Sequence, residues 1–312
     1  MSLYPPPTEV STTLFSRLPD TLRLHNQPSG WVDANKPGQA VDSFLEGPSF
    51  DRNGQLYLVD IPYGRILQVS PEGEWQVVTQ YDGWPNGLKI HADGRIFIAD
   101  YKHGIMVLEP RQTEVKPYLT HVRSESFKGV NDLIFDSQGR LYFTDQGQTG
   151  MQDPSGRVYR YDPASNRLDC LISTGISPNG LALSPDEKTL YVAMTRGNAV
   201  WRLPLVDNAP LTKVGIFVQM AGGVSGADGI AVDESGAVYV ADAGNGCVWS
   251  FDASGRPLHR YPSCAGGRTV TNLAFGGDNR KTLYMVDSSK GVVFQVRVDT
   301  PGLMMFSHGD YR

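Results

Sequence analysis

The chain has 312 residues, a net charge of −5 at neutral pH, 34 glycines and 21 prolines. This length suits one large domain or two ordinary ones, and the acidic balance disfavours a nucleic-acid surface, which needs clustered lysine and arginine. No apolar run reaches the ~18 residues of a membrane span, and the opening MSLYPPPTEV lacks the basic and apolar regions of a signal peptide.

The odd number of cysteines and the absence of a CxxC spacing predict free thiols in a cytoplasmic protein. The three cysteines are Cys170, Cys247 and Cys264.

Taken in chain order, residues 1–11 are predicted to be a loose lead-in, residues 12–19 a strand, and the polar stretch to about residue 42 a connection. From there one pattern occurs six times. Each copy has a short apolar strand opened by Asn, Asp or Glu, a turn rich in Asp, Asn and Gly, a second strand, and two further strands. The opening residues lie 40 to 49 residues apart, and they are Glu46, Asn86, Asn131, Asn179, Asp228 and Asn272.

Six copies of four strands at this spacing predict an all-β fold, a six-bladed β-propeller of four-stranded antiparallel blades. The sixth copy has no clear fourth strand after Val298, so we expect the strand at residues 12–19 to take that place and close the ring. The whole of 1–312 then forms a single β-propeller domain, with residues 299–312 as a C-terminal tail.

The innermost strand of each blade lines the central channel, so the six opening residues should meet at one mouth of it. The second strands return to the same mouth and end in a second set of residues, of which five are aspartates that we interpret as turn-stabilising. That second set is Asp60, Asp100, Asp145, Met194, Asp242 and Asp287.

The inner ring differs from the turn aspartates, because it combines four amides with only two acids. Two carboxylates converging in a channel would repel each other unless a cation neutralised them. Oxygen-only ligation favours Ca²⁺, Mg²⁺ or Mn²⁺ over a soft metal. No GxSxG, GxGxxG or GxxxxGK[ST] sequence supports another chemistry. Of the histidines, the repeat places only His103 near this mouth, whereas His91 is predicted to be a solvated turn residue on the opposite face.

The segments EGPSF, GVNDLIFDSQGRLYFTD, SPNGLALSPDEKTLYVA and GADGIAVDESGAVYVAD resemble the SMP-30/gluconolactonase/luciferin-regenerating-enzyme-like family of six-bladed propeller lactonases. The resemblance implies one divalent metal ion, with Ca²⁺ expected first and Mg²⁺, Mn²⁺ or Zn²⁺ as alternatives. The implied metal ligands are Glu46, Asn179 and Asp228, and Asp228 is also the implied general base. It also implies that Asn131 contacts the substrate.

Two positions depart from that family. Gly129 stands where many relatives have a basic residue, with Lys128 one step away, and Met194 replaces an acid at the end of a second strand. Both departures concern the substrate pocket, which makes an uncharged or more apolar lactone an alternative to a sugar lactone. We expect Asn131, Lys128, Asn86 and His103 to contact the substrate.

The leading prediction is therefore hydrolysis of a small-molecule lactone by metal-activated water, in a monomer or homodimer with no nucleic-acid or membrane partner. One alternative is a non-catalytic propeller that binds a ligand or protein, since the fold alone does not set function. Another keeps the metal but hydrolyses aryl esters or phosphotriesters. The long loop at residues 146–157 is either a lid or a decoration.

Overall fold

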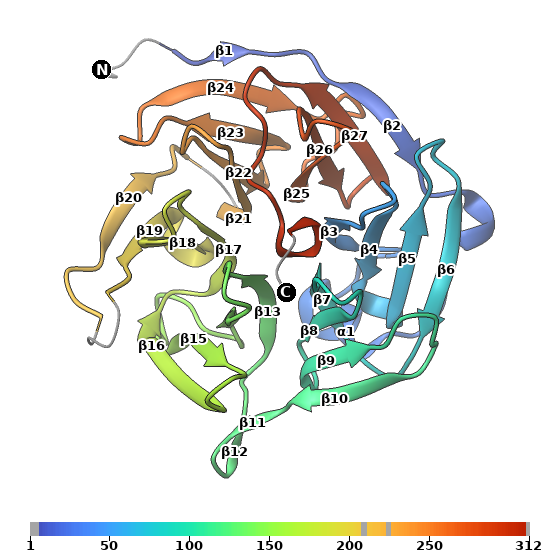
Figure 1. Ribbon diagram of the computed structural model, residues 1–312. Coiled ribbons are helices and arrows are strands. Elements are labelled where there is room, and N and C mark those ends of the chain that lie inside the picture. Colours follow the sequence, from blue (N-terminus) through green and yellow to red (C-terminus); the bar gives the residue numbers. More distant parts are fainter. Residues whose placement is uncertain (1–5, 207–210, 223–225, 310–312) are drawn as a thin grey trace.

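In the computed structural model, residues 6–206, 211–222 and 226–309 are described. Six blades, each built on four antiparallel strands, surround a central axis, and this arrangement confirms the predicted six-bladed β-propeller (Figure 1). Blade one consists of β3 (Leu45–Phe50), β4 (Leu56–Asp60), β5 (Arg65–Val69) and β6 (Trp75–Gln80). Blade two consists of β7 (Pro85–Ile90), β8 (Ile96–Asp100), β9 (Gly104–Leu108) and β10 (Val115–Leu119). Blade three consists of β13 (Val130–Phe135), β14 (Leu141–Asp145), β15 (Gly156–Asp162) and β16 (Arg167–Gly175).

Blades four and five continue the same order from the axis outward. Blade four consists of β17 (Pro178–Leu183), β18 (Thr189–Met194), β19 (Ala199–Pro204) and β20 (Gly215–Gln219). Blade five consists of β21 (Gly226–Val232), β22 (Val238–Ala243), β23 (Cys247–Phe251) and β24 (Pro257–Pro262). Blade six takes three strands from the end of the chain, β25 (Val270–Gly276), β26 (Thr282–Asp287) and β27 (Val292–Arg297).

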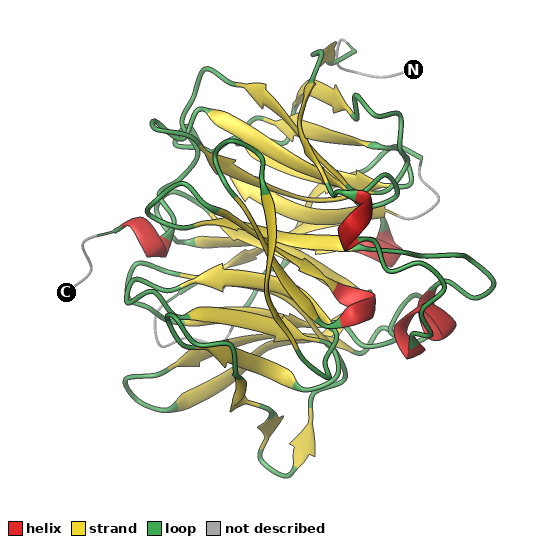
Figure 2. Ribbon diagram, turned by 90° about the vertical axis from the view of Figure 1, so that its right-hand side faces the viewer, coloured by secondary structure: helices red, strands yellow, loops and turns green. Residues whose placement is uncertain are grey.

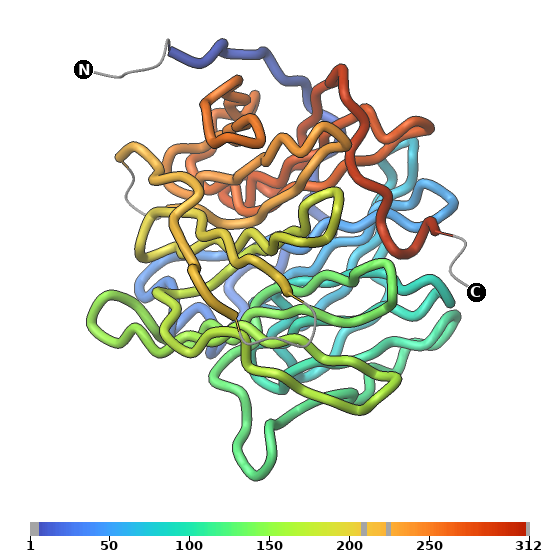
Figure 3. The backbone as a smooth tube through the Cα atoms, turned by 60° about the vertical axis from the view of Figure 1, so that its left-hand side comes forward, coloured from blue at the N-terminus to red at the C-terminus, as the bar shows by residue number. Residues whose placement is uncertain are grey.

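The N-terminal segment supplies the outer edge of the last two blades. Strand β2 (Thr13–Arg17) pairs antiparallel with β27 and is the fourth strand of blade six. Strand β1 (Thr8–Glu9) pairs in parallel with β24 of blade five. Figure 3 shows this blue segment lying along the orange and red blades. The first part of the chain is therefore joined to the last part.

Glycines allow the innermost strands to approach each other closely. A Cβ added to Gly87 would lie 2.6 Å from Asp132 Oδ1, and one added to Gly180 would lie 2.4 Å from the carbonyl oxygen of Asp228. Neighbouring innermost strands contact one another all the way round, from β3 through β7, β13, β17 and β21 to β25 and back to β3. In the four blades that have glycine after the ring residue, it is thus a packing requirement, since a side chain there would collide with the next blade.

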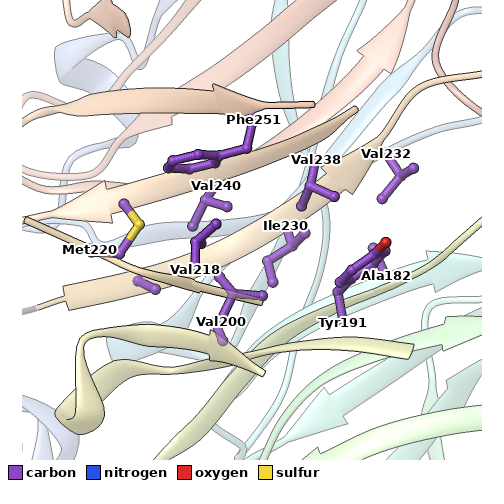
Figure 4. Close-up of a cluster of buried hydrophobic side chains, with 12 residues drawn as sticks. Ala182, Tyr191, Val200, Val218, Met220, Ile230, Val232, Val238, Val240 and Phe251 are labelled. Carbon is purple, nitrogen blue, oxygen red and sulfur yellow. The ribbon is translucent and has the colours of Figure 1, made fainter. Parts of the chain in front are cut away.

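The hydrophobic core is divided into six layers, each between two adjacent blades. In the layer between blades four and five, Tyr191, Val200 and Val218 pack against Ile230, Val240 and Phe251 (Figure 4). Side chains on alternate positions of the strands fill these layers from both sides, as the period of a β-strand dictates.

The few helices lie on the two faces of the disc. The helix α1 (Gly30–Asn35) and the 3₁₀ turns η2 (Ile61–Tyr63) and η3 (Thr195–Gly197) lie on one face, and η4 (Phe306–His308) lies on the other (Figure 2). Sequence analysis missed α1, which falls in the polar connection. It also missed a hairpin of β11 (His121–Val122) and β12 (Glu125–Ser126), and the turn η1 (Asp20–Leu22). Among the described residues, no helix is long and apolar enough to cross a membrane.

Candidate active site

The six ring residues meet at the mouth of the channel on the α1 face, and all six are at least 91% buried. In every blade the pairing between the first two strands shifts register at the ring residue. Bulges of this kind redirect a side chain out of the regular alternation of a strand. Repetition of the bulge in all six blades gives the ring its common orientation.

Glu46 is held by hydrogen bonds to one of its two carboxylate oxygens. Its Oε2 accepts hydrogen bonds from the backbone N–H of Gly47 at 2.6 Å and from Asn272 Nδ2 at 2.8 Å. The side chain is 4% exposed. Because both hydrogen bonds end on Oε2, Oε1 is the oxygen left to bind another partner.

Two ring amides are fixed through their nitrogen atoms. Asn131 Nδ2 donates to Gln146 Oε1 at 2.9 Å, and Asn179 Nδ2 donates to Thr195 Oγ1 at 3.1 Å. Thr195 in turn donates to the carbonyl oxygen of Ala227 at 2.7 Å, next to Asp228. With the nitrogens engaged in this way, the amide oxygens are the atoms available to a cation or a substrate.

The carboxylates of the site are poorly compensated by the protein itself. Burial, and then the nearby charge of Asp132, raise the pKa of Asp228 from an ordinary value of 3.8 to about 8. Burial and then the charge of Asp228 also raise the pKa of Glu46 well above its usual range. Buried acids with raised pKa values are typical of functional sites, and a cation would lower both values.

Asp132 is a third buried acid that sequence analysis missed. Its Oδ1 accepts from the N–H of Leu133 at 2.8 Å and lies 3.9 Å from Lys89 Nζ. The sequence carried one signal for it. Four of the six ring residues are followed by glycine, whereas Asn131 is followed by Asp132. Leu273 occupies this position in blade six, so Asp132 is the one carboxylate among the six residues that follow the ring.

The donor set fits a hard divalent cation. Glu46 and Asp228 offer carboxylate oxygens, Asn179 offers an amide oxygen, and the raised pKa values show that two acids lack a full counter-charge. Among the described residues, no three His, Cys, Asp or Glu side chains form a metal cluster by themselves. A bound ion therefore depends on the amide oxygen as well as the acids.

The aspartates that end the second strands have structural partners, as expected. Asp60 accepts from the N–H of Phe44 at 2.7 Å, and Asp145 accepts from the N–H of Gly129 at 2.8 Å. Asp100 Oδ1 accepts from the N–H of Lys102 at 2.8 Å. These side chains fasten the loops of the mouth.

The predicted substrate contacts do not all come together. Asn86 and Asn131 are part of the buried ring. Lys128 is exposed, and its ammonium donates to Ser155 Oγ at 2.5 Å in the loop of blade three. His103 lies away from the ring, where it lines a separate surface pocket together with His121, and its Nε2 is 2.6 Å from the carbonyl oxygen of Asp82. The repeat placed His103 near the mouth, but its loop turns outward.

Comparison with known proteins identifies the family. The model of the SMP-30/gluconolactonase/LRE-like region matches residues 44–289. The chain belongs to this family. It is 33% identical over 244 residues to a lactonase drp35 of Staphylococcus aureus, an alignment covering 73% of this chain and 71% of the relative. It is 34% identical over 238 residues to a lactonase drp35 of Staphylococcus epidermidis, with the same coverage.

Solved structures of the family share the fold. A gluconolactonase from Xanthomonas campestris superposes with a TM-score of 0.72 at 21% identity, over 95% of this chain and 97% of that one. A calcium-binding regucalcin from Agrobacterium tumefaciens superposes with a TM-score of 0.73 at 21% identity, over 95% and 99% of the two chains. At this identity the similarity speaks for the propeller alone.

Proposed function

We propose that this protein is a lactonase that uses one divalent cation, with calcium expected first, bound by Glu46, Asn179 and Asp228. The named lactonases among its relatives support an enzyme that opens a small-molecule lactone. The observation that carries the metal is the buried ring, in which two acids with raised pKa values face amide oxygens.

In the proposed mechanism, Glu46, Asn179 and Asp228 would hold the cation, which would supply a polarised lactone carbonyl and a lowered pKa for water. Asp228 accepts the proton of the attacking water, a role that requires its ionised form. Glu46, fixed by Gly47 and Asn272, balances charge without moving. Asn131, which Gln146 holds in place, orients the lactone. The acyl C–O bond of the ring then breaks, and its oxygen takes the proton from Asp228 to give a hydroxy acid. Water is the nucleophile throughout, so no covalent intermediate with the protein is needed.

The test is a panel of lactones, an aryl ester and a phosphotriester, assayed with purified protein before and after treatment with a chelator. Glu46→Gln and Asp228→Asn keep the size of each side chain but remove its charge, and each should lower lactone hydrolysis by about a hundredfold or more. Asp252→Asn is the matched control, because Asp252 accepts backbone N–H bonds in an outer turn. If Glu46→Gln or Asp228→Asn hydrolyses the lactone at the wild-type rate in the presence of the chelator, the proposal is excluded.

The same panel decides between the chemical alternatives. Hydrolysis of the aryl ester or phosphotriester without lactone opening would favour the second reaction class, and binding without turnover would favour a non-catalytic propeller.

The cellular compartment is also a proposal. Cys170, Cys247 and Cys264 are all free, as expected for a reducing cytoplasm.

A further inference from the structure

Two basic side chains that sequence analysis missed lie at the mouth of the channel. Lys36 follows α1, and Arg196 lies in η3. Both interact electrostatically with Asp228, and the charge of Arg196 also acts on Lys36, where it lowers the pKa. They come from opposite sides of the ring, since α1 packs beside blades one and two and η3 belongs to blade four.

Lys36 is held by a helix that is itself firmly anchored. Ser29 Oγ donates to the carbonyl oxygen of Pro62 at 2.7 Å and caps the helix, accepting from the N–H of Val32 at 3.5 Å. Trp31 is 6% exposed, and its ring centroid lies 5.0 Å from that of Phe44. The ammonium of Lys36 lies 5.2 Å from the same Phe44 ring. Phe44 directly precedes the strand of Glu46, so α1 brings its lysine to the edge of the ring.

Arg196 is placed by the hydrogen bonds of its neighbour. Thr195 accepts from Asn179 and donates to the carbonyl of Ala227, so the backbone of η3 is connected to two ring positions. The turn ends at Asn198, which has a left-handed backbone (φ 47°). Arg196 itself is exposed and therefore free to meet an incoming molecule.

Neither cation has a hydrogen-bonded anionic partner among the residues that the structure describes. Within the described part of the chain, no ion pair or side-chain hydrogen bond involves Lys36 or Arg196. Lys36 is half-buried, and burial lowers its pKa. The negative charge of Asp228 acts in the opposite direction and raises the pKa of Lys36. A half-buried ammonium that has an aromatic ring but no hydrogen-bonded anion beside it is costly, and the charge of Arg196 opposes it further. A divalent ion bound by Glu46 and Asp228 would balance the charge of these two acids, so Lys36 and Arg196 would remain as surplus positive charge at this mouth.

We propose that Lys36 and Arg196 bind an anionic group of the substrate, so that the preferred lactone carries a carboxylate outside the reacting ring. This inference rests on the proposed lactonase function, and it argues against the alternative of an uncharged or more apolar lactone, which rested on Gly129 and Met194. The guanidinium of Arg196 offers the paired N–H donors that suit a carboxylate, and Lys36 adds a point charge from the other side. The hydroxy acid released by hydrolysis has two carboxylates and should also bind here.

The test compares two lactones of nearly equal size, butyrolactone-γ-carboxylate and the corresponding carboxamide, with the calcium-loaded enzyme. The readout is the ratio of their kcat/KM values. Lys36→Met and Arg196→Met should each lower this ratio by about tenfold, the effect of a lost charge-assisted hydrogen bond. Lys36→Arg should restore most of it. Lys116→Met, on the outer strand β10, is the matched control and should keep the wild-type ratio.

The possible outcomes separate this inference from the proposed function. If both lactones are hydrolysed and the ratio is the same in Lys36→Met, Arg196→Met and wild type, the anion site is wrong and the lactonase proposal stands. If neither lactone is hydrolysed, the lactonase proposal loses its support, and calorimetric titration with the ring-opened hydroxy-dicarboxylate decides. Weaker binding to Lys36→Met than to wild type supports the anion site, and equal or absent binding overturns it.

Discussion

Gly229 offers a direct test of how the ring is built. It follows Asp228, and a Cβ added there would lie 2.2 Å from Asn272 Oδ1 and 2.7 Å from Asn272 Cα. The second contact is with backbone, so a rotamer change cannot relieve it. Overpacking of this kind costs about 1–3 kcal/mol. Gly229→Ala should therefore lower the urea midpoint of unfolding.

The same substitution should also weaken calcium binding, because Asn272 donates to Glu46 Oε2 at 2.8 Å and must move. The assay is urea unfolding followed by tryptophan fluorescence, in chelator and in calcium. Gly215→Ala in β20 is the matched control, since its added Cβ would lie 3.8 Å from the nearest atom, Arg202 Nε. A change of less than about 1 kcal/mol is expected there. Equal midpoints and equal calcium stabilisation in the two variants would refute the reasoning.

Three further predictions follow from the buried charges and the N-terminal strand. Burial raises the pKa of Asp228 to about 8 from an ordinary 3.8. In the presence of a chelator, Asp228 therefore contributes fully to the free energy of unfolding below about pH 4, and this contribution is lost as the pH rises towards 8. Stabilisation by calcium should therefore grow across that window, and a pH-independent shift in melting temperature would contradict this. Lys89→Met removes the cation that opposes the raised pKa of Asp132, so it should destabilise the protein by about 1–3 kcal/mol at pH 8 and by less at pH 5. An equal loss at both pH values would point to packing instead. Removal of residues 1–17 takes β2 from blade six, uncovers the edge of β27 and should lower the melting temperature and promote aggregation, as calorimetry and light scattering would show. An unchanged melting temperature would mean that β2 contributes little.

The fold was predictable because each repeat carries its own signals. Turn residues such as those of HADGR and DESGA, apolar strands of regular length and a nearly constant spacing specify blades without knowledge of long-range contacts. The ring was predictable for the same reason, since one strand position repeats. The bulge at that position was not, because it arises from pairing between strands.

What the sequence could not show depends on segments that lie far apart along the chain. Lys36 reaches Asp228 only because α1 docks beside blades one and two, and the polar stretch around α1 carries no repeat signal. His91 was expected in solvent, yet its ring lies 4.8 Å from that of Phe306, which the C-terminal segment brings across the opposite mouth. The sequence also did not show that His103 lines a surface pocket with His121, because a loop position in the repeat does not fix the direction of a side chain.

The pairing of β2 with β27 also bears on how the protein is made. Residues 13–17 leave the ribosome long before residues 292–297. At about 5–20 residues per second, roughly 15 to 55 s separate the two partners during synthesis. For that time the strand has no place in a blade, and the apolar layer between blades six and one stays open. A chaperone that shields Phe15 and Leu18 during this interval would raise the yield of folded protein more than one that acts on the completed chain.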